Sequence, residues 1–176
     1  VEQAGKRIAQ HCKRLGVHID FAPDIDINTN PQNPIIGNRS FGESKFNVAQ
    51  KGVALTKGMQ SVGVLACGKH FPGHGDTEKD SHKTLPTVSF SRERLESTEF
   101  YPFQQLISAG VASLMVGHLN VPALDEGKPT SISYKVVSGL IKQQMGFQGL
   151  IFSDALGMKG VADYAESSQV DLQAFL

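Results

Sequence analysis

The sequence has no excess charge of either sign and no long apolar run. Its 176 residues include 17 Lys and Arg against 17 Asp and Glu, so the formal net charge is zero. Nucleic-acid binders normally carry a basic excess, and anionic membrane surfaces attract polybasic segments. No stretch reaches the roughly 18 consecutive apolar residues that a membrane span requires. These absences argue against nucleic-acid and membrane partners, and they favour a small, largely neutral molecule or another protein.

Cysteines and nucleotide-binding glycine motifs are also scarce. Cys12 and Cys67 lack C-x-x-C spacing, and both are predicted to be small, buried apolar side chains, although a disulfide between them stays open. Neither a G-x-G-x-x-G sequence nor a Walker A loop follows any apolar run, which weakens a nucleotide-binding interpretation. We expect no cofactor.

Both ends of the chain have helical patterns that look incomplete. Apolar residues from Ala4 to Leu15 recur at helical spacing, and neither an initiator methionine nor a signal peptide precedes them. Residues 160–176 are predicted to begin a helix whose packing partner lies outside the chain. We therefore expect the chain to be a piece of a longer protein.

A helix-like stretch, a glycine and a short apolar run follow one another four times. The apolar runs are VHIDFA, VLAC, VASLMV and LIF, and the glycines before them are Gly16, Gly63, Gly110 and Gly146. Glycine just past a helix takes the left-handed capping conformation without a Cβ clash. The helix-like segments between the runs are predicted at roughly 45–62, 91–109 and 133–145. Helices that alternate with buried strands predict an α/β fold with a parallel sheet.

Polar residues gather directly after the predicted strands. In chain order they are Asp24 and Asp26, then Lys69 and His70, then His118, and last Asp154. In a (β/α)8 barrel and in a doubly wound sheet alike, the active site lies at the carboxyl ends of the strands. The pattern therefore predicts the face of the site and leaves both folds open. Four strands cannot close a barrel, which needs eight.

The densest polar segment is GKHFPGHGDTEKDSHKTLP, residues 68–86. Asp80 lies two residues before His82, close enough to accept its Nδ1 proton and to leave Nε2 free for acid–base chemistry. Such residues in a Gly- and Pro-rich loop are often simply exposed. Three histidines within thirteen residues of a chain that has six favour a function.

The same segment also supports a metal site. Its candidate ligands, which lie at short spacing, are His70, His74 and Asp76.

Asp154 is the second candidate for chemistry. It follows the apolar run of GLIFSD, where burial and neighbouring cations can tune a carboxyl group, although an Asp at this position is more often a helix N-cap. Arg39 would ordinarily anchor its loop through the guanidinium group. His118 and Asp26 are as readily structural as functional.

Four segments together resemble glycoside hydrolase family 3, and within it the bacterial β-N-acetylglucosaminidases. They are VHIDFAPDIDIN, NPIIGNRSFG, GKHFPGHGDTEKDSHKTLP and LIFSDALGM. The segments occur in the family's order, and K-H-F-P-G-H-G followed after four residues by D-S-H is a signature of the subgroup. The resemblance implies that residues 1–176 are part of the family's N-terminal (β/α)8 TIM barrel domain, about strands 3 to 7.

The resemblance also implies roles for single residues. Asp154 corresponds to the catalytic nucleophile, His82 to the acid/base, and Asp80 to the carboxylate that polarises it. The residues expected to hydrogen-bond the terminal sugar are Lys69, His70 and Arg39. The implied reaction is retaining hydrolysis of terminal β-linked N-acetylglucosamine from peptidoglycan-derived or related glycans, through a covalent glycosyl-enzyme and without a metal.

Two other functions stay open from the sequence. One is a metal-dependent hydrolase that uses the ligands His70, His74 and Asp76, and the other is a non-catalytic sugar-binding barrel. The sequence also leaves open a further catalytic or accessory domain after the C-terminus, and either a cytoplasmic or a cell-envelope location in a bacterium.

Overall fold

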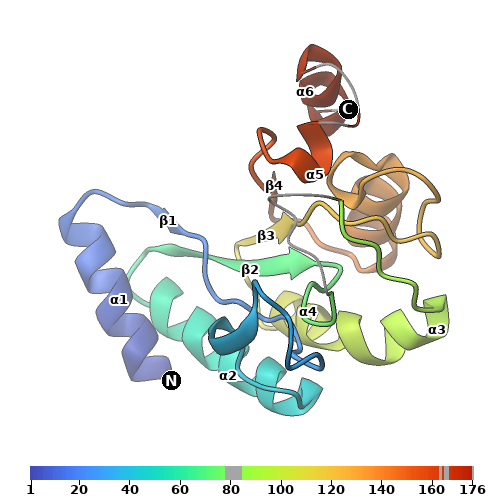
Figure 1. The fold of residues 1–176 in the computed structure, drawn as a ribbon. Coiled ribbons are helices and arrows are strands. Elements are labelled where there is room, and N and C mark those ends of the chain that lie inside the picture. The colour runs from blue at the N-terminus through green and yellow to red at the C-terminus, as the bar shows by residue number, and fades with distance from the viewer. Residues whose placement is uncertain (78–84, 163, 165–166, 176) are drawn as a thin grey trace.

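Four parallel strands form one sheet in the order β1–β2–β3–β4 (Figure 1). The computed structural model describes residues 1–77, 85–162, 164 and 167–175. Within these ranges the strands are β1 (Ile19–Asp20), β2 (Leu65–Phe71), β3 (Ser113–Val116) and β4 (Leu150–Ser153). Strands that are neighbours in sequence are neighbours in the sheet, as in the successive βα units of a barrel. The predicted parallel α/β fold is confirmed.

Helices lie along one side of the sheet, where α1 (Glu2–Arg14), α2 (Lys45–Gln60) and α4 (Phe100–Ser108) are seen below the strands in Figure 1. The short helix α3 (Arg92–Arg94) and the π-helical segment η2 (Leu95–Glu99) lead into α4. A second π-helical segment, η4 (Lys135–Gln144), precedes β4. These bounds agree with the three predicted helical segments to within a few residues.

The loops carry two turns of 3-10 helix, η1 (Gly37–Arg39) and η3 (Thr130–Ile132). Near the C-terminus, α5 (Lys159–Ala162) and α6 (Ser167–Phe175) lie above the β4 end of the sheet in Figure 1. They bury Val161 and Val170 against Ile132. The predicted helical character of this segment is confirmed, although it forms two short helices, and η3 supplies a packing partner within the chain.

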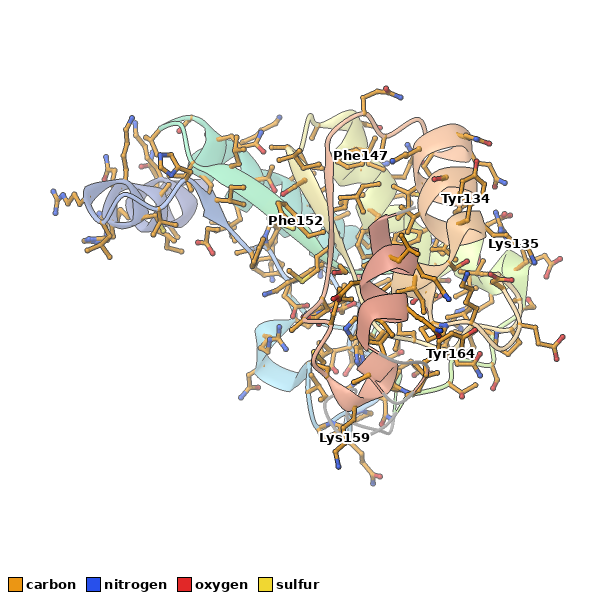
Figure 2. The ribbon with its side chains drawn as sticks, turned by 90° about the horizontal axis from the view of Figure 1, so that it is seen from above. Tyr134, Lys135, Phe147, Phe152, Lys159 and Tyr164 are labelled. Atoms are coloured by element: carbon orange, nitrogen blue, oxygen red, sulfur yellow. The ribbon has the colours of Figure 1, made fainter. Side chains whose placement is uncertain are left out.

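The sheet curls. Phe21 follows β1 and Phe152 lies on β4, yet their rings meet edge to face with centroids 5.2 Å apart. Two strands separate β1 from β4 in the sheet, so a flat sheet would hold these rings much farther apart. Figure 2, which looks down from above, shows Phe152 toward the middle of the molecule and Tyr134 and Lys135 at its periphery, where η4 begins. The curl is that of half a barrel.

The predicted glycine caps are confirmed. Each of the four glycines stands between a helical segment and the strand that follows it, with a φ of 75°, 84°, 81° and 70° at Gly16, Gly63, Gly110 and Gly146. A residue with a Cβ is strained at such angles, so glycine allows the chain to turn sharply from helix into strand.

The main core lies between the sheet and its helices. Phe71 at the end of β2 packs on Phe100 and Phe103 of α4, with ring centroids 5.3 and 5.1 Å apart. Gly68 lets the same helix approach the strand, because a Cβ there would lie 2.9 Å from Leu106 Cδ2. Cys67 is buried as predicted, whereas Cys12 is half-buried, and both thiols are free.

No helix in the described ranges is long and apolar enough to cross a bilayer.

Helices α1 and α2 cross at two glycines. A Cβ on Gly58 would clash with the carbonyl oxygen of Glu2, and one on Gly5 would clash with that of Leu55. Each contact is against backbone, which cannot rotate away as a side chain can. The close approach of α1 to α2 therefore depends on the absence of a side chain at both positions.

We expect Gly58→Ala to lower the free energy of unfolding by about 1–3 kcal/mol, as overpacking of a tight contact does. The matched control is Gly139→Ala in η4, because the nearest atom to its added Cβ, Tyr134 O, is 3.9 Å away. That change should be neutral or should stabilise by up to about 1 kcal/mol through helix propensity. Denaturant unfolding of both variants checks this, and equal effects would contradict the packing argument.

Candidate active site

A cavity of about 220 Å³ opens at the carboxyl ends of the strands. Every strand, or the loop that leaves it, contributes to its wall. The lining residues are Phe21, Ile35, Arg39, Lys69, His70, His74, Met115 and Asp154. Four of the residues that the sequence predicts for the catalytic and sugar-binding site therefore line one cavity: Arg39, Lys69, His70 and Asp154.

The carboxylate of Asp26 connects the exits of β1 and β2. Asp26 is fully buried, and it accepts hydrogen bonds from the backbone N–H of His74 at 2.7 Å and from that of His70 at 3.2 Å. It also lies 2.7 Å from His70 Nδ1. Burial by itself raises the pKa of this carboxyl, but the interaction with His70 and the N–H of His74 lower it below its ordinary value. Asp26 is therefore an ionised anchor.

The His70 ring is oriented at both nitrogens. A carboxylate can only accept, so Nδ1 donates its proton to Asp26. In the neutral ring Nε2 is then an acceptor, and it faces Nη2 of Arg39 at 3.4 Å. Both side chains line the cavity, so their polar atoms can turn to the hydroxyl groups of a ligand.

Lys69 and His70 line the cavity although they are consecutive residues of one strand. Alternation along a regular strand would send one of them to the opposite face. The pairing of β2 with β3 shifts register between Gly68 and Phe71, and the Lys69–His70 and Phe71–Pro72 peptide bonds are cis. The register shift thus coincides with the point where two polar side chains enter the site.

Asp24 forms an ion pair inside the site. Its Oδ2 lies 3.3 Å from Nη2 of Arg39, and its side chain is 7% exposed. Burial, followed by the negative charge of Asp26, raises the pKa of Asp24 to about 7, against the influence of His70 and Arg39. Two carboxyls so close together are therefore not equally ionised: Asp26 carries the charge, and Asp24 gains protons as the pH falls through neutrality.

The three predicted metal ligands do not meet. His70 Nδ1 is bonded to Asp26, His74 Nδ1 lies 2.6 Å from Thr77 Oγ1, and Asp76 Oδ1 accepts from Thr29 Oγ1 at 2.8 Å. In the described part of the chain, possible metal-ligand atoms come together within 4.8 Å in another set: Asp24, Asp26 and His70. Arg39 already places a positive charge beside that set, which favours an ion pair over a bound cation.

His74 lines the cavity as a buried neutral ring. The hydroxyl group of Thr77 donates to the carbonyl oxygen of His74 at 3.0 Å. The hydroxyl oxygen can therefore accept a hydrogen bond from His74 Nδ1. Burial lowers the pKa of His74, against the negative charge of Asp26.

Asp154 is presented by the backbone that leaves β4. Its N–H donates to Val116 O at 2.9 Å, which continues the pairing of β3 with β4 by one residue. Its Oδ1 accepts from the N–H of Ala155 at 2.8 Å. The half-buried carboxylate is thereby held at the cavity wall, with one oxygen engaged by the backbone.

The sequence identified the polar wall but missed the apolar one. Phe21, Ile35 and Met115 carried no signal, because apolar residues in and after strands are expected in any core. Asp80 and His82, the predicted acid/base pair, lie outside the described residues. The segment that carries them starts directly after Thr77, which contacts the cavity residue His74.

A model of the glycosyl hydrolase family 3 N-terminal domain matches residues 1–175. The chain belongs to glycoside hydrolase family 3. Its four curled parallel strands correspond to part of that family's barrel domain.

Similar proteins support membership in family 3. The β-hexosaminidase A of Pseudoalteromonas piscicida is 36% identical over 180 residues, a match that covers 96% of this chain and 30% of that protein. A family 3 β-N-acetylglucosaminidase from Paenibacillus sp. str. FPU-7 superposes with a TM-score of 0.96 at 40% identity, over 98% of this chain and 33% of that one.

A third relative is NagZ from Neisseria gonorrhoeae, whose structure holds N-trifluoroacetyl-D-glucosamine. It has a TM-score of 0.89 and 34% identity over 99% of this chain and 50% of its own. The family 3 chain thus spans between 30% and 50% of the length of these relatives.

In this family 3 site we expect Asp24→Asn to stabilise the protein at pH 8. A carboxyl with a raised pKa in the folded state contributes stability while it is protonated, and that contribution is lost as the pH rises through about 7. Asparagine resembles the protonated form at every pH. The gain should be on the order of 3 kcal/mol above pH 7 and should vanish toward pH 4.

Thermal unfolding between pH 4 and pH 8 measures this difference, with the exposed Asp171→Asn as the matched control. A variant less stable than wild type at pH 8 would show that the ion pair with Arg39 outweighs the burial of Asp24.

Proposed function

We propose that the intact protein is a retaining β-N-acetylglucosaminidase, and that residues 1–176 supply part of its N-terminal barrel domain. Its substrates would be peptidoglycan-derived or related glycans that end in β-linked N-acetylglucosamine. One observation carries the proposal: Asp154 shares a single cavity with Arg39, Lys69 and His70. The β-hexosaminidase names of the relatives and the N-acylglucosamine analogue in the gonococcal structure support the same substrate class.

The cavity suits one sugar ring. Its 220 Å³ lies below the roughly 300–1,000 Å³ typical of pockets for drug-sized ligands. Arg39 and Lys69 are donors only and would bind hydroxyl oxygens, while His70 Nε2 can accept from a hydroxyl group. Phe21 and Met115 offer apolar surface for the C–H faces of the ring. The site thus combines a polar and an apolar wall, as a carbohydrate requires.

The reaction follows from a carboxylate nucleophile and a separate proton donor. Asp154 would form a bond to the anomeric carbon while the glycosidic C–O bond breaks, and His82 would give its proton to the departing oxygen. Water would then attack the same carbon and lose a proton to His82, and the carboxylate of Asp154 would leave. Asp80 would hold the imidazole in the tautomer that these steps need.

The two alternative functions give different results in simple assays. A metal-dependent hydrolase would lose activity in excess EDTA, and the separate partners of His70, His74 and Asp76 speak against it. A non-catalytic sugar-binding barrel would bind N-acetylglucosamine without hydrolysing an aryl β-N-acetylglucosaminide. Hydrolysis by the intact protein in EDTA therefore decides among the three.

Asp154→Asn should lower kcat on an aryl β-N-acetylglucosaminide on the order of 10⁴-fold or more, because the nucleophile is lost. The amide preserves shape and the acceptor for Ala155, so the melting temperature should hardly change. Asp171→Asn on α6 is the matched control and should keep full activity. Near-normal turnover by Asp154→Asn would refute the assignment.

His82→Ala should slow hydrolysis of substrates with poor leaving groups by about 10²–10⁴-fold, the usual contribution of general acid catalysis. Activated aryl glycosides need little protonation and should be much less affected. Asp80→Asn should fall between wild type and His82→Ala. Steady-state kinetics on a series of leaving groups tests this, and equal losses across the series would remove His82 as the acid.

A further inference from the structure

His118 is a fully buried histidine at the exit of β3, and it does not line the cavity. Its Nε2 lies 3.0 Å from the carbonyl oxygen of Ala155, the residue after Asp154. A carbonyl can only accept, so Nε2 carries the proton and donates it. Nδ1 lies 2.6 Å from Ser131 Oγ, so the ring is held at both nitrogens.

The segment η3 fixes the ring and the backbone next to it. Thr130, which is buried, brackets His118: its Oγ1 donates to Gly117 O at 2.7 Å and accepts from Leu119 N–H at 3.2 Å. The N–H of Thr130 also donates to Leu119 O at 2.9 Å. The backbone on both sides of His118 is thus fixed to the turn that carries Ser131, so the ring is a rigid donor.

The His118 ring contacts the loop after β4 at Ala155. The Ala155 carbonyl accepts from His118 and from the N–H of Met158 at 3.0 Å, which closes the turn locally. The N–H of the same residue donates to Asp154 Oδ1. Of these two bonds to the carbonyl, the one from His118 comes from the segment that follows another strand, β3. It therefore adds a second link between this loop and the end of β3, beside the bond from Asp154 N–H to Val116 O.

We propose that His118 is a positioning residue for Asp154, acting through Ala155. Ser131 and Thr130 fix the imidazole, the imidazole fixes Ala155, and the N–H of Ala155 fixes one oxygen of the carboxylate. The inference rests on the proposed role of Asp154 as nucleophile. Its effect belongs to the step in which the carboxylate must reach the anomeric carbon, where a misplacement of about 1 Å can cost 10²-fold in rate.

Two substitutions distinguish the effect of losing the hydrogen bond to Ala155 from the effect of losing the imidazole ring. Glutamine can carry an amide N–H to about the place of Nε2, whereas the shorter asparagine ends near Nδ1 and loses the donor. We expect His118→Asn in the intact protein to lower kcat on an aryl β-N-acetylglucosaminide by about 10–100-fold. His118→Gln should keep kcat within about threefold of wild type. Ser131→Ala should fall between the two, because it frees the ring without removing it.

The dissociation constant of N-acetylglucosamine, measured by calorimetry, is the second readout. It should stay within about threefold of wild type in all three variants, because Arg39, Lys69 and His70 are untouched. Equal losses of kcat and affinity, or equal kcat in the Gln and Asn variants, would overturn the proposal. If His118→Asn does not fold, a wild-type kcat for Ser131→Ala overturns it as well. Absence of turnover by wild type would instead count against the proposed function.

Discussion

The hydrogen bonds of the buried Asp26 carboxylate are the interactions on which the Arg39 and His70 side of the candidate site depends. Asp26 accepts two backbone N–H groups and the imidazole of His70, so it joins the exits of β1 and β2. Its own carbonyl oxygen accepts from Ser40 Oγ at 2.6 Å, which fixes the residue after Arg39. An ionised group without access to water is tolerated only with such partners, and removing them would leave an uncompensated charge. Arg39, His70 and His74 are thus placed relative to one another by a single residue.

The Asp154 side of the candidate site is built in a similar way. Asp26 follows β1 and reaches to β2, while His118 follows β3 and reaches to the loop after β4. In each case a fully buried polar side chain beyond a strand end hydrogen-bonds to residues at the end of the next strand. The curl of the sheet then turns both halves toward one cavity, as the contact of Phe21 with Phe152 shows. Of the candidate residues on the cavity wall, Arg39, Lys69 and Asp154 remain partly exposed, whereas His70 is buried.

The sequence predicted the elements and the face of the site because both follow from local patterns. Glycines at 16, 63, 110 and 146 mark helix ends by a steric rule, and Asp154 and Lys69 follow apolar runs that can only be strands. The opposite pKa shifts of Asp24 and Asp26 could not be predicted, because both residues follow the same strand and differ only in their tertiary partners. The metal interpretation failed for a related reason. Short spacing in a Gly- and Pro-rich loop does not determine side-chain directions, and His74 and Asp76 turn to Thr77 and Thr29 instead.

The most direct test is to trap the covalent intermediate on the intact protein. A 5-fluoro-N-acetylglucosaminyl fluoride should glycosylate the enzyme faster than the adduct is hydrolysed, and peptide mass spectrometry locates the label. We expect one equivalent of sugar on the carboxylate of Asp154. A label on another carboxylate, or full turnover with no covalent adduct at any time, would contradict it.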